Sequence, residues 1–465
     1  MDIQDYYQLT PVHDYIRDAG IIGGHGKPAT EDVLVNILHR LAPRCLAISR
    51  CVCKPWRTII DARCLLRADL LPHLVGGIFI NFHDLILSEF ISRPSIGPTI
   101  SGNFNYLPHN SIVRDHCNGL LLLDGYADYP ATRQYYVVNP ATRQWVQLPP
   151  CPSSHPGMYS ESTEYLVFDP GLSSQFEVFV IPYARVMPYA SVLHRNIQLD
   201  PMIEKIEWPP SPCILHVFSS RTKQWEERSF VREGEAAGTL AKIRPNFPHF
   251  LQNAVYWRGV LYFTIICRIS LSGKYQIIKP PQSPLDIGDM DDSNIYLGRS
   301  QKGIYCTFVD NPCGVYILDE SYGKMEWVLK HRICYVPRQE FHQIGPWTLQ
   351  DINFYEHIGH SEYDNSEAIE EQKFEWDSDN DNVIDINNRS NLTGYVTILG
   401  FHPYKEVVFL SHTLTRGLAY HLNTRKVQDM GNIRPKYYGT DMGIQPFIEG
   451  SFPYTPWLGE FPEDN

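Results

Sequence analysis

The sequence lacks the short motifs that mark the large enzyme families. It contains no Gly-x-Ser-x-Gly nucleophile elbow, no P-loop and no dinucleotide-binding fingerprint. His116 and Cys117 are neighbours in the chain, so on a strand their side chains would point to opposite faces and could not act as a base and a nucleophile. His357 and His360 do not have the spacing of a recognised metal site. We therefore expect a protein that is not an enzyme, with no catalytic residues, no cofactor and no metal.

Paired cysteines, long apolar runs and an N-terminal signal segment are also missing. The 11 cysteines are scattered without a Cys-x-x-Cys pair, and several lie in apolar runs, which is typical of buried free thiols in a reducing compartment. No stretch reaches the roughly 18 apolar residues of a membrane span, because the best one, at 74–87, is interrupted by polar residues. We expect a protein of the cytoplasm, the nucleus or both, with no membrane partner.

Positive charge is scarce over the chain as a whole. The formal net charge of -12 argues against a nucleic-acid-binding surface, so we expect no nucleic acid partner. The balance inverts locally, because seven basic residues and a single acid, Asp61, lie between Arg40 and Arg67. This basic segment fits either an acidic protein partner or a solvated helix face.

Residues 31–60 have the pattern of a compact helical module. Thr30 is a suitable N-cap, and acidic residues follow it in the first helical turn. Pro43 begins a second element, and a third helix is expected with Pro55 in its first turn. Three helices in about 30 residues cannot bury this much apolar surface by themselves. The module is therefore predicted to dock, either onto a partner or, as an ordinary subdomain, onto the rest of the chain.

This pattern resembles the F-box. The matching residues are Glu31-Asp32-Val33-Leu34, Ile37-Leu38, Arg40-Leu41, Pro43, Leu46, Arg50-Cys51-Val52-Cys53-Lys54, Trp56-Arg57 and Ile59-Ile60. The ending Cys-Val-Cys-Lys-x-Trp-Arg is typical of the large plant F-box families. Those families usually begin with Leu-Pro, where this chain has Ala29 and Thr30, so the strength of docking stays open.

The F-box resemblance implies a partner and a set of contact residues. The partner is a Skp-type adaptor and, through it, a cullin. The residues expected to bind the adaptor, together with forming the module's own core, are Glu31, Leu34, Ile37, Leu38, Leu41, Pro43, Leu46, Val52, Cys53 and Trp56.

The rest of the chain contains a degraded repeat. An apolar strand, a polar turn and a strand with an aromatic residue recur, and the aromatic positions are Trp145, Trp225, Tyr275 and Trp327, with Val427 in the last unit. Their separations of 80, 50, 52 and 100 indicate a unit of about 50 residues. A glycine or turn followed by another strand precedes each unit. This is typical of kelch-like propeller blades, and a β-sandwich is the alternative. We expect the repeat aromatics to be largely buried between sheets.

Two further motifs resemble the F-box-associated domain of plant F-box proteins. They are His116-Cys117-Asn118-Gly119-Leu120-Leu121 and Tyr136-Val137-Val138-Asn139-Pro140-Ala141-Thr142-Arg143-Gln144-Trp145, closing on Leu148-Pro149-Pro150. With the helical module upstream, the resemblance implies the substrate-recognition subunit of an SCF-type ubiquitin ligase, whose β domain binds an unidentified target protein. The alternative is a propeller-type small-ligand binder or enzyme that carries a helical arm and is not coupled to ubiquitination.

The expected fold class is α+β and multidomain, with a small three-helix F-box and an all-β, propeller-like domain of roughly five to seven irregular blades. Two insertions are expected in it: a Pro-rich surface loop at 182–213, and a disordered acidic loop at 361–385 with ten acids and one base. Calcium binding by the acidic loop is not expected, because Asn382 and Asn388 replace the required glycine and glutamate. The predicted organisation is a flexible arm at 1–28, the F-box at 29–70, a connecting segment at 71–110, the β domain at 111–450 and a tail at 451–465.

Overall fold

The computed structural model divides the chain into two units, Met1–His73 and Leu74–Asn465, called here the helical unit and the β unit. The structure describes residues 31–38, 49, 53–62, 74–95, 100–126, 133–152, 161–183, 202, 205–239, 241, 253–263, 267–278, 281, 295–308, 313–321, 325–333, 345–358, 376–384, 396–439, 446–459 and 461.

Two of the three expected helices lie in the described part of the helical unit. Helix α2 (Glu31–Leu38) begins directly after Thr30, as its cap predicts, and α4 (Lys54–Ala62) has Pro55 in its first turn. Leu38 and Ile60 are fully buried against each other, and partly buried side chains of both helices pack around them. The middle helix expected from Pro43 onward lies outside the described residues.

The β unit is built mostly of antiparallel strands, which confirms the β-rich domain expected from the sequence. The described strands form six groups of four. Sheet 1 contains β26 (Ile448–Tyr454), β1 (Gly77–Phe82), β2 (Glu89–Ser92) and β21 (Thr348–Leu349); sheet 2 contains β3 (Ser111–Cys117), β4 (Leu120–Tyr126), β5 (Arg133–Asn139) and β6 (Gln144–Gln147); sheet 3 contains β7 (Glu161–Phe168), β8 (Phe176–Tyr183), β10 (Cys213–Ser219) and β11 (Gln224–Glu233).

The remaining sheets follow the same order. Sheet 4 contains β13 (Ala254–Trp257), β14 (Val260–Phe263), β15 (Cys267–Ser270) and β16 (Lys274–Ile277); sheet 5 contains β17 (Ile295–Ser300), β18 (Gly303–Phe308), β19 (Cys313–Asp319) and β20 (Glu326–Ile333); sheet 6 contains β22 (Val396–Phe401), β23 (Val407–His412), β24 (Arg416–His421) and β25 (Val427–Asn432). Parallel pairing of β11 with β16 joins sheets 3 and 4 into one eight-stranded sheet. A short ribbon, β9 (Glu207–Trp208) with β12 (Gly238–Thr239), and one helix, α8 (Ile352–Ile358), complete the described elements of this unit.

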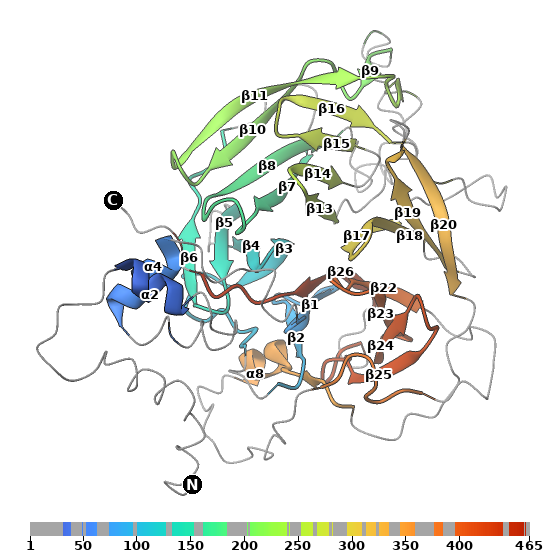
Figure 1. Ribbon diagram of the computed structural model, residues 1–465. Helices are drawn as coiled ribbons and strands as arrows, with labels where there is room; N and C mark the ends of the chain where they lie inside the picture. Colours follow the sequence, from blue (N-terminus) through green and yellow to red (C-terminus); the bar gives the residue numbers. More distant parts are fainter. Residues whose placement is uncertain are drawn as a thin grey trace, which may run out of the picture. The chain divides into compact units, whose positions relative to one another are not determined.

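The first strands of the six sheets form a closed ring. Strands β26, β3, β7, β13, β17 and β22 contact one another in that order, and β22 returns to β26 (Figure 1). Sheet 1 closes the ring, because β1 from the start of the unit pairs with β26 from its end, from Gly77 opposite Tyr454 onward. This arrangement is propeller-like and differs from the two facing sheets of a sandwich.

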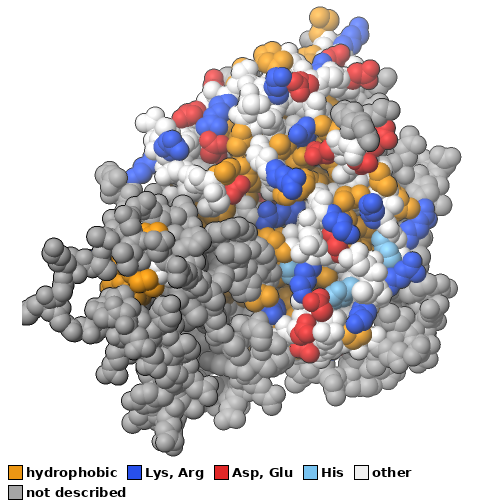
Figure 2. Space-filling model, viewed as in Figure 1, with side chains coloured by type: hydrophobic (Ala, Val, Ile, Leu, Met, Phe, Trp, Pro, Cys, Tyr) orange, Lys and Arg blue, Asp and Glu red, His pale blue; other side chains and the backbone are white. Residues whose placement is uncertain are grey.

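Hydrophobic clusters fill the spaces between neighbouring sheets. One cluster joins sheets 2, 3 and 4, and others lie between sheets 4 and 5, 5 and 6, 6 and 1, and 1 and 2. A four-stranded sheet cannot bury both of its faces alone, so each sheet is stabilised by its two neighbours. On the visible face, charged side chains of both signs are intermixed with exposed hydrophobic ones (Figure 2).

The repeat positions occupy the same place in successive sheets. Trp145, Trp225, Tyr275, Trp327 and Val427 all lie in the fourth strand, opposite the third strand of the same sheet. In four of the five hairpins the residue two positions earlier has a positive φ: Arg143 (57°), Lys223 (57°), Gly273 (87°) and Arg425 (60°). A left-handed residue at this place lets a short loop reverse the strand direction.

The depth of the repeat aromatics differs from the expectation of uniform burial. Tyr275 is only 2% exposed, since it packs in the cluster of sheets 2, 3 and 4, and its single hydroxyl proton is shared between the carbonyls of Pro209 and Pro210, at 3.0 and 2.8 Å. Trp145 is 37% exposed, so the prediction of burial is wrong for this residue. Trp225 is intermediate, with its indole N–H 2.9 Å from the carbonyl of Pro149. The last strand of each sheet is the outermost, so the burial of its side chains depends on which loops pack over it.

The β unit extends beyond the boundaries expected from the sequence. The segment at 71–110, expected to be a connection, contains β1 and β2 of sheet 1. The segment at 451–465, expected to be a tail, continues β26 and then packs through Phe461 into the cluster between sheets 2, 3 and 4. In the Pro-rich insertion at 182–213, β9 is part of the fold and Trp208 is buried.

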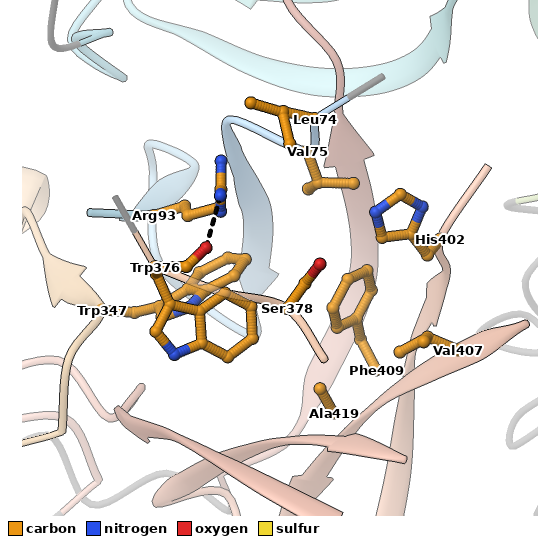
Figure 3. A pocket seen from close by; sticks show the side chains of 10 residues that line it. All are labelled: Leu74, Val75, Arg93, Trp347, Trp376, Ser378, His402, Val407, Phe409 and Ala419. Atoms are coloured by element: carbon orange, nitrogen blue, oxygen red, sulfur yellow. Dashed lines mark hydrogen bonds between the residues drawn. The ribbon is translucent and has the colours of Figure 1, made fainter. Parts of the chain in front are cut away.

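Part of the acidic insertion is ordered, which corrects its assignment as a disordered loop throughout. Residues 376–384 are described, and the indole of Trp376, 2% exposed, lies edge-on to Trp347 with ring centroids 5.4 Å apart. Figure 3 shows both indoles in the apolar pocket beside Phe409, with Arg93 donating to the carbonyl of Trp376 at 2.5 Å. Residues 361–375 lie outside the described residues.

Candidate functional site

The predicted adaptor-binding residues are distributed over a small core and its rim. Leu38 is in the core, Leu34, Ile37 and Trp56 are half-buried, and Cys53 is exposed just before α4. The side chain of Glu31 and the residues Leu41, Pro43, Leu46 and Val52 lie outside the described residues. The half-buried apolar side chains on α2 and α4 leave hydrophobic surface at the rim that a partner could cover.

A recess of about 50 Å³ lies inside the ring of the β unit. Its walls come from the ends of β3, β17, β22 and β26 and from the start of β13. Asn118, Pro403 and Thr455, which follow β3, β22 and β26, contribute to its lining. The lining residues that carry polar side chains are Asp115, His116, Cys117, Asn118, Asn253, Tyr256, Tyr296, Arg299 and Thr455.

The motif His116-Cys117-Asn118-Gly119 forms one wall of the recess at the turn from β3 to β4. The thiol of Cys117 donates to the carbonyl of Phe168 at 3.2 Å, and Asn118 Nδ2 donates to the same oxygen at 2.6 Å. These bonds tie sheet 2 to sheet 3. Gly119 has a φ of 96°, and a Cβ there would lie 2.4 Å from Cβ of Trp457, so only glycine fits.

Arg299 supplies the positive charge of the recess. Its guanidinium donates to Oδ1 of Asn118 at 2.6 Å, which links sheet 5 to sheet 2 across the ring. The same group lies 5.6 Å from the centre of the Tyr404 ring, a cation–π distance. Among the residues that the structure describes, Arg299 forms no ion pair with a carboxylate.

Burial shifts the pKa values of two further side chains of this wall, Asp115 and His116 on β3, toward their neutral forms. Burial raises the pKa of Asp115 to about 8, although its Oδ2 accepts a hydrogen bond from the backbone N–H of Leu166 at 2.7 Å. Burial, together with the positive charge of Arg299, lowers the pKa of His116 to about 4. The recess therefore carries a net positive charge at neutral pH.

The second landmark motif holds the end of the chain. Asn139 Nδ2 donates to the carbonyls of Trp457 and Gly459, both at 3.0 Å, and Gln144 Oε1 accepts from the backbone N–H of Phe461 at 3.1 Å. The indole of Trp457 packs on Phe168 with centroids 4.8 Å apart. The first landmark motif thus bonds sheet 2 to sheets 3 and 5, and the second bonds it to the segment after β26.

The chemistry available in the described part of the chain is recognition by charge and hydrogen bonds. No group of three or more His, Cys, Asp or Glu side chains that could hold a metal occurs among the described residues. The apolar pocket of Figure 3 has a volume of about 10 Å³, which is room for one water molecule at most. No helix in the described ranges is both long and apolar enough to span a bilayer.

Sequence reasoning missed Arg299, Tyr404 and Trp457 as residues of this site. Arg299 follows an ordinary strand pattern, and nothing local distinguishes it from a solvated arginine on a strand. Asn118 and Gly119 were found as a motif, but the sequence did not show that they face Arg299 and Trp457.

Comparison with known proteins identifies one domain. Residues 30–67 match the model of the F-box domain. No curated protein matches the chain. A solved structure from an analysis of two prolyl endopeptidases is similar over 92% of this chain at 7% identity, with a TM-score of 0.29, too low to carry an argument. This chain covers only 55% of that one. The sequence match, together with helices α2 and α4 within it, shows that the chain carries an F-box domain at residues 30–67.

Proposed function

We propose that this protein is the substrate-recognition subunit of an SCF-type ubiquitin ligase. The F-box domain docks on a Skp-type adaptor and, through it, on a cullin, while the β unit binds a target protein. The observation that carries this proposal is the F-box match at residues 30–67. F-box domains typically bind such adaptors, and the proteins that carry them are generally not catalytic. The protein acts in the cytoplasm, the nucleus or both.

The helical unit supports docking through its packing. Its described core consists of Leu38 and Ile60, with Leu34, Trp56 and Ile59 packed around them and only partly covered. So small a core does not stabilise a domain by itself, and covering its rim with a partner adds buried apolar surface. Large aromatic side chains at such rims often contribute most to binding, which singles out Trp56.

The β unit supports a role in recognition. We infer that it is a kelch-like, F-box-associated propeller, because its sheets form a ring and the two landmark motifs bond sheet 2 to sheet 3 and to the segment after β26. The two cavities described above are too small for a typical small-molecule substrate, which needs roughly 300 Å³ or more.

Adaptor binding by purified variants tests the proposal. Trp56→Ala should lower the affinity for a Skp-type adaptor at least tenfold, since anchors of this kind contribute about 2 kcal/mol or more. Thr58→Ala is the matched control, because Thr58 is exposed on the same helix and bonds only to its own backbone turn. Circular dichroism should show an unchanged β unit in both variants. Equal adaptor binding by wild type and Trp56→Ala, or no adaptor binding by the wild type, would overturn the proposal.

A further inference from the structure

We propose that the recess inside the ring binds a carboxylate group carried by a protein segment, with Arg299 as the residue that holds it. The inference deepens the proposed function, because it says that the target protein carries a carboxylate that this recess recognises. It rests on the proposed function only for the statement that the ligand belongs to a ubiquitination target. Binding of the carboxylate itself is a property of the β unit and can be measured separately.

The first observation is a positive charge without a counter-ion. Arg299 presents five N–H donors and uses one of them on Asn118. Its charge has no carboxylate partner in the described part of the chain. Partly burying a guanidinium in this way costs free energy, and an anion entering the recess recovers it through charge-assisted hydrogen bonds.

The second observation is that the guanidinium is held in place before any ligand arrives. Asn118 fixes one edge of it at 2.6 Å, and Asn118 is itself anchored by its bond to Phe168. The ring of Tyr404 lies 5.6 Å from it. A group oriented in advance loses little conformational entropy on binding, so the remaining N–H donors can meet a planar carboxylate in two-pronged geometry.

The third observation is that the neighbouring titratable groups do not cancel or add to the positive charge of Arg299. Asp115 is tied to the backbone of Leu166, and burial keeps it protonated at neutral pH, so it does not neutralise Arg299. His116 is also neutral at this pH, so it neither repels Arg299 nor adds a second positive charge to the recess. One negative charge on a ligand therefore neutralises the single positive charge of the recess.

The fourth observation is size. A volume of about 50 Å³ is a third of the roughly 150 Å³ cavity that accepts benzene. It admits a carboxylate group and little more, so the rest of the ligand must lie outside. A protein segment lying across the residues that follow β3, β22 and β26 can insert an acidic side chain or a chain terminus.

The test measures peptide binding to the full chain by calorimetry. The probes are a blocked peptide, acetyl-Ala-Ala-Glu-Ala-Ala-amide, its Gln counterpart, an acetylated pentaalanine with a free C-terminal carboxylate, and inorganic phosphate. The Glu peptide or the free terminus should bind at least tenfold more tightly than the Gln peptide, and the comparison of these two distinguishes a side chain from a terminus as the source. Arg299→Gln should lower that affinity at least tenfold.

The control is Arg258→Gln, because Arg258 also stacks on an aromatic ring, 4.4 Å from Trp257, but does not line the recess. If Arg299→Gln does not fold, histidine NMR of the wild type replaces it: a bound carboxylate should raise the pKa of His116, identified by comparison with His116→Gln. Binding of both carboxylate peptides no tighter than that of the Gln peptide, undiminished binding by Arg299→Gln, an unmoved His116, or equally tight phosphate binding overturns the inference. Adaptor binding, measured separately, reports on the proposed function.

Discussion

At the scale of single residues, Asp115 shows how tertiary contacts change the chemistry of a side chain. It lies on β3 at a strand irregularity, fully enclosed, and bonds to the backbone of the neighbouring sheet. Burial without a positive partner favours the protonated acid, which raises its pKa to about 8. The folded state therefore holds a proton that the unfolded chain releases near its ordinary value of 3.8.

This difference makes a prediction for Asp115→Asn. Between pH 4 and pH 8 Asp115 is protonated in the folded state and ionised in the unfolded state, so its contribution to the free energy of unfolding falls as pH rises. The amide cannot ionise, so the variant should gain stability relative to wild type by up to about 1.4 kcal/mol per pH unit. Urea unfolding at pH 6.5 and pH 8 checks this, because the other titrating groups, His116 among them, are the same in the two proteins and cancel in the comparison. Parallel pH dependences for the two proteins would contradict it.

At the scale of elements, the acidic insertion shows that a highly charged composition does not prevent part of a segment from packing on the fold. The segment 376–384 lies beside sheets 1 and 6, with a bridge between Val383 and Gln428 of β25. Gln428 also donates to the carbonyls of Asp377 and Asp381, and Lys405 bonds to Asp379. The carboxylates stay exposed while the backbone and Trp376 make the contacts, so high local charge is compatible with packing here.

Trp376→Ala should therefore destabilise the β unit by about 3–5 kcal/mol, since it removes a fully buried indole from the cluster between sheets 1 and 6. Trp145→Ala is the control, because its indole is 37% exposed and lies on an outer strand. Thermal unfolding should show a clearly lower midpoint for Trp376→Ala than for Trp145→Ala. A midpoint for Trp376→Ala within error of wild type would mean that 376–384 is not a structural element.

At the scale of the β unit as a whole, stability depends on closing the ring. Strand β26 completes sheet 1, and the residues after it cross to sheets 2 and 3 through Trp457 and Phe461. Asn139 and Gln144 hold this crossing segment by its backbone. The chain end thus fastens three successive sheets.

A chain ended after Tyr454 should lose these contacts while keeping β26. Its unfolding midpoint should fall, and unfolding should become less cooperative, because sheets 1, 2 and 3 lose their shared cover. A chain ended at Phe461 keeps every one of these bonds and is the control. Differential scanning calorimetry distinguishes the outcomes, and identical melting of the two truncated chains would show that the closure does not need the segment after β26.

The sequence by itself determined the local elements of this protein. The caps and apolar spacing of residues 31–60 predicted α2 and α4, because helix formation is set by nearby residues. The recurrence of Trp145, Trp225, Tyr275 and Trp327 predicted a strand at each of these places, and each is the fourth strand of its sheet. This was possible because a hairpin is specified by its own turn residues and by the apolar pattern of its two strands.

Only the tertiary structure decided what distant segments do together. It placed 71–110 in sheet 1, because β1 finds its partner β26 at the other end of the β unit. It buried Trp376 within an acidic stretch and left Trp145 exposed, because burial depends on which surface lies opposite. It brought Arg299 into contact with Asn118, 181 residues away in the sequence, and no local sequence pattern predicts that contact. A ring closes between segments remote in sequence, so its recess forms only when all six sheets are in place.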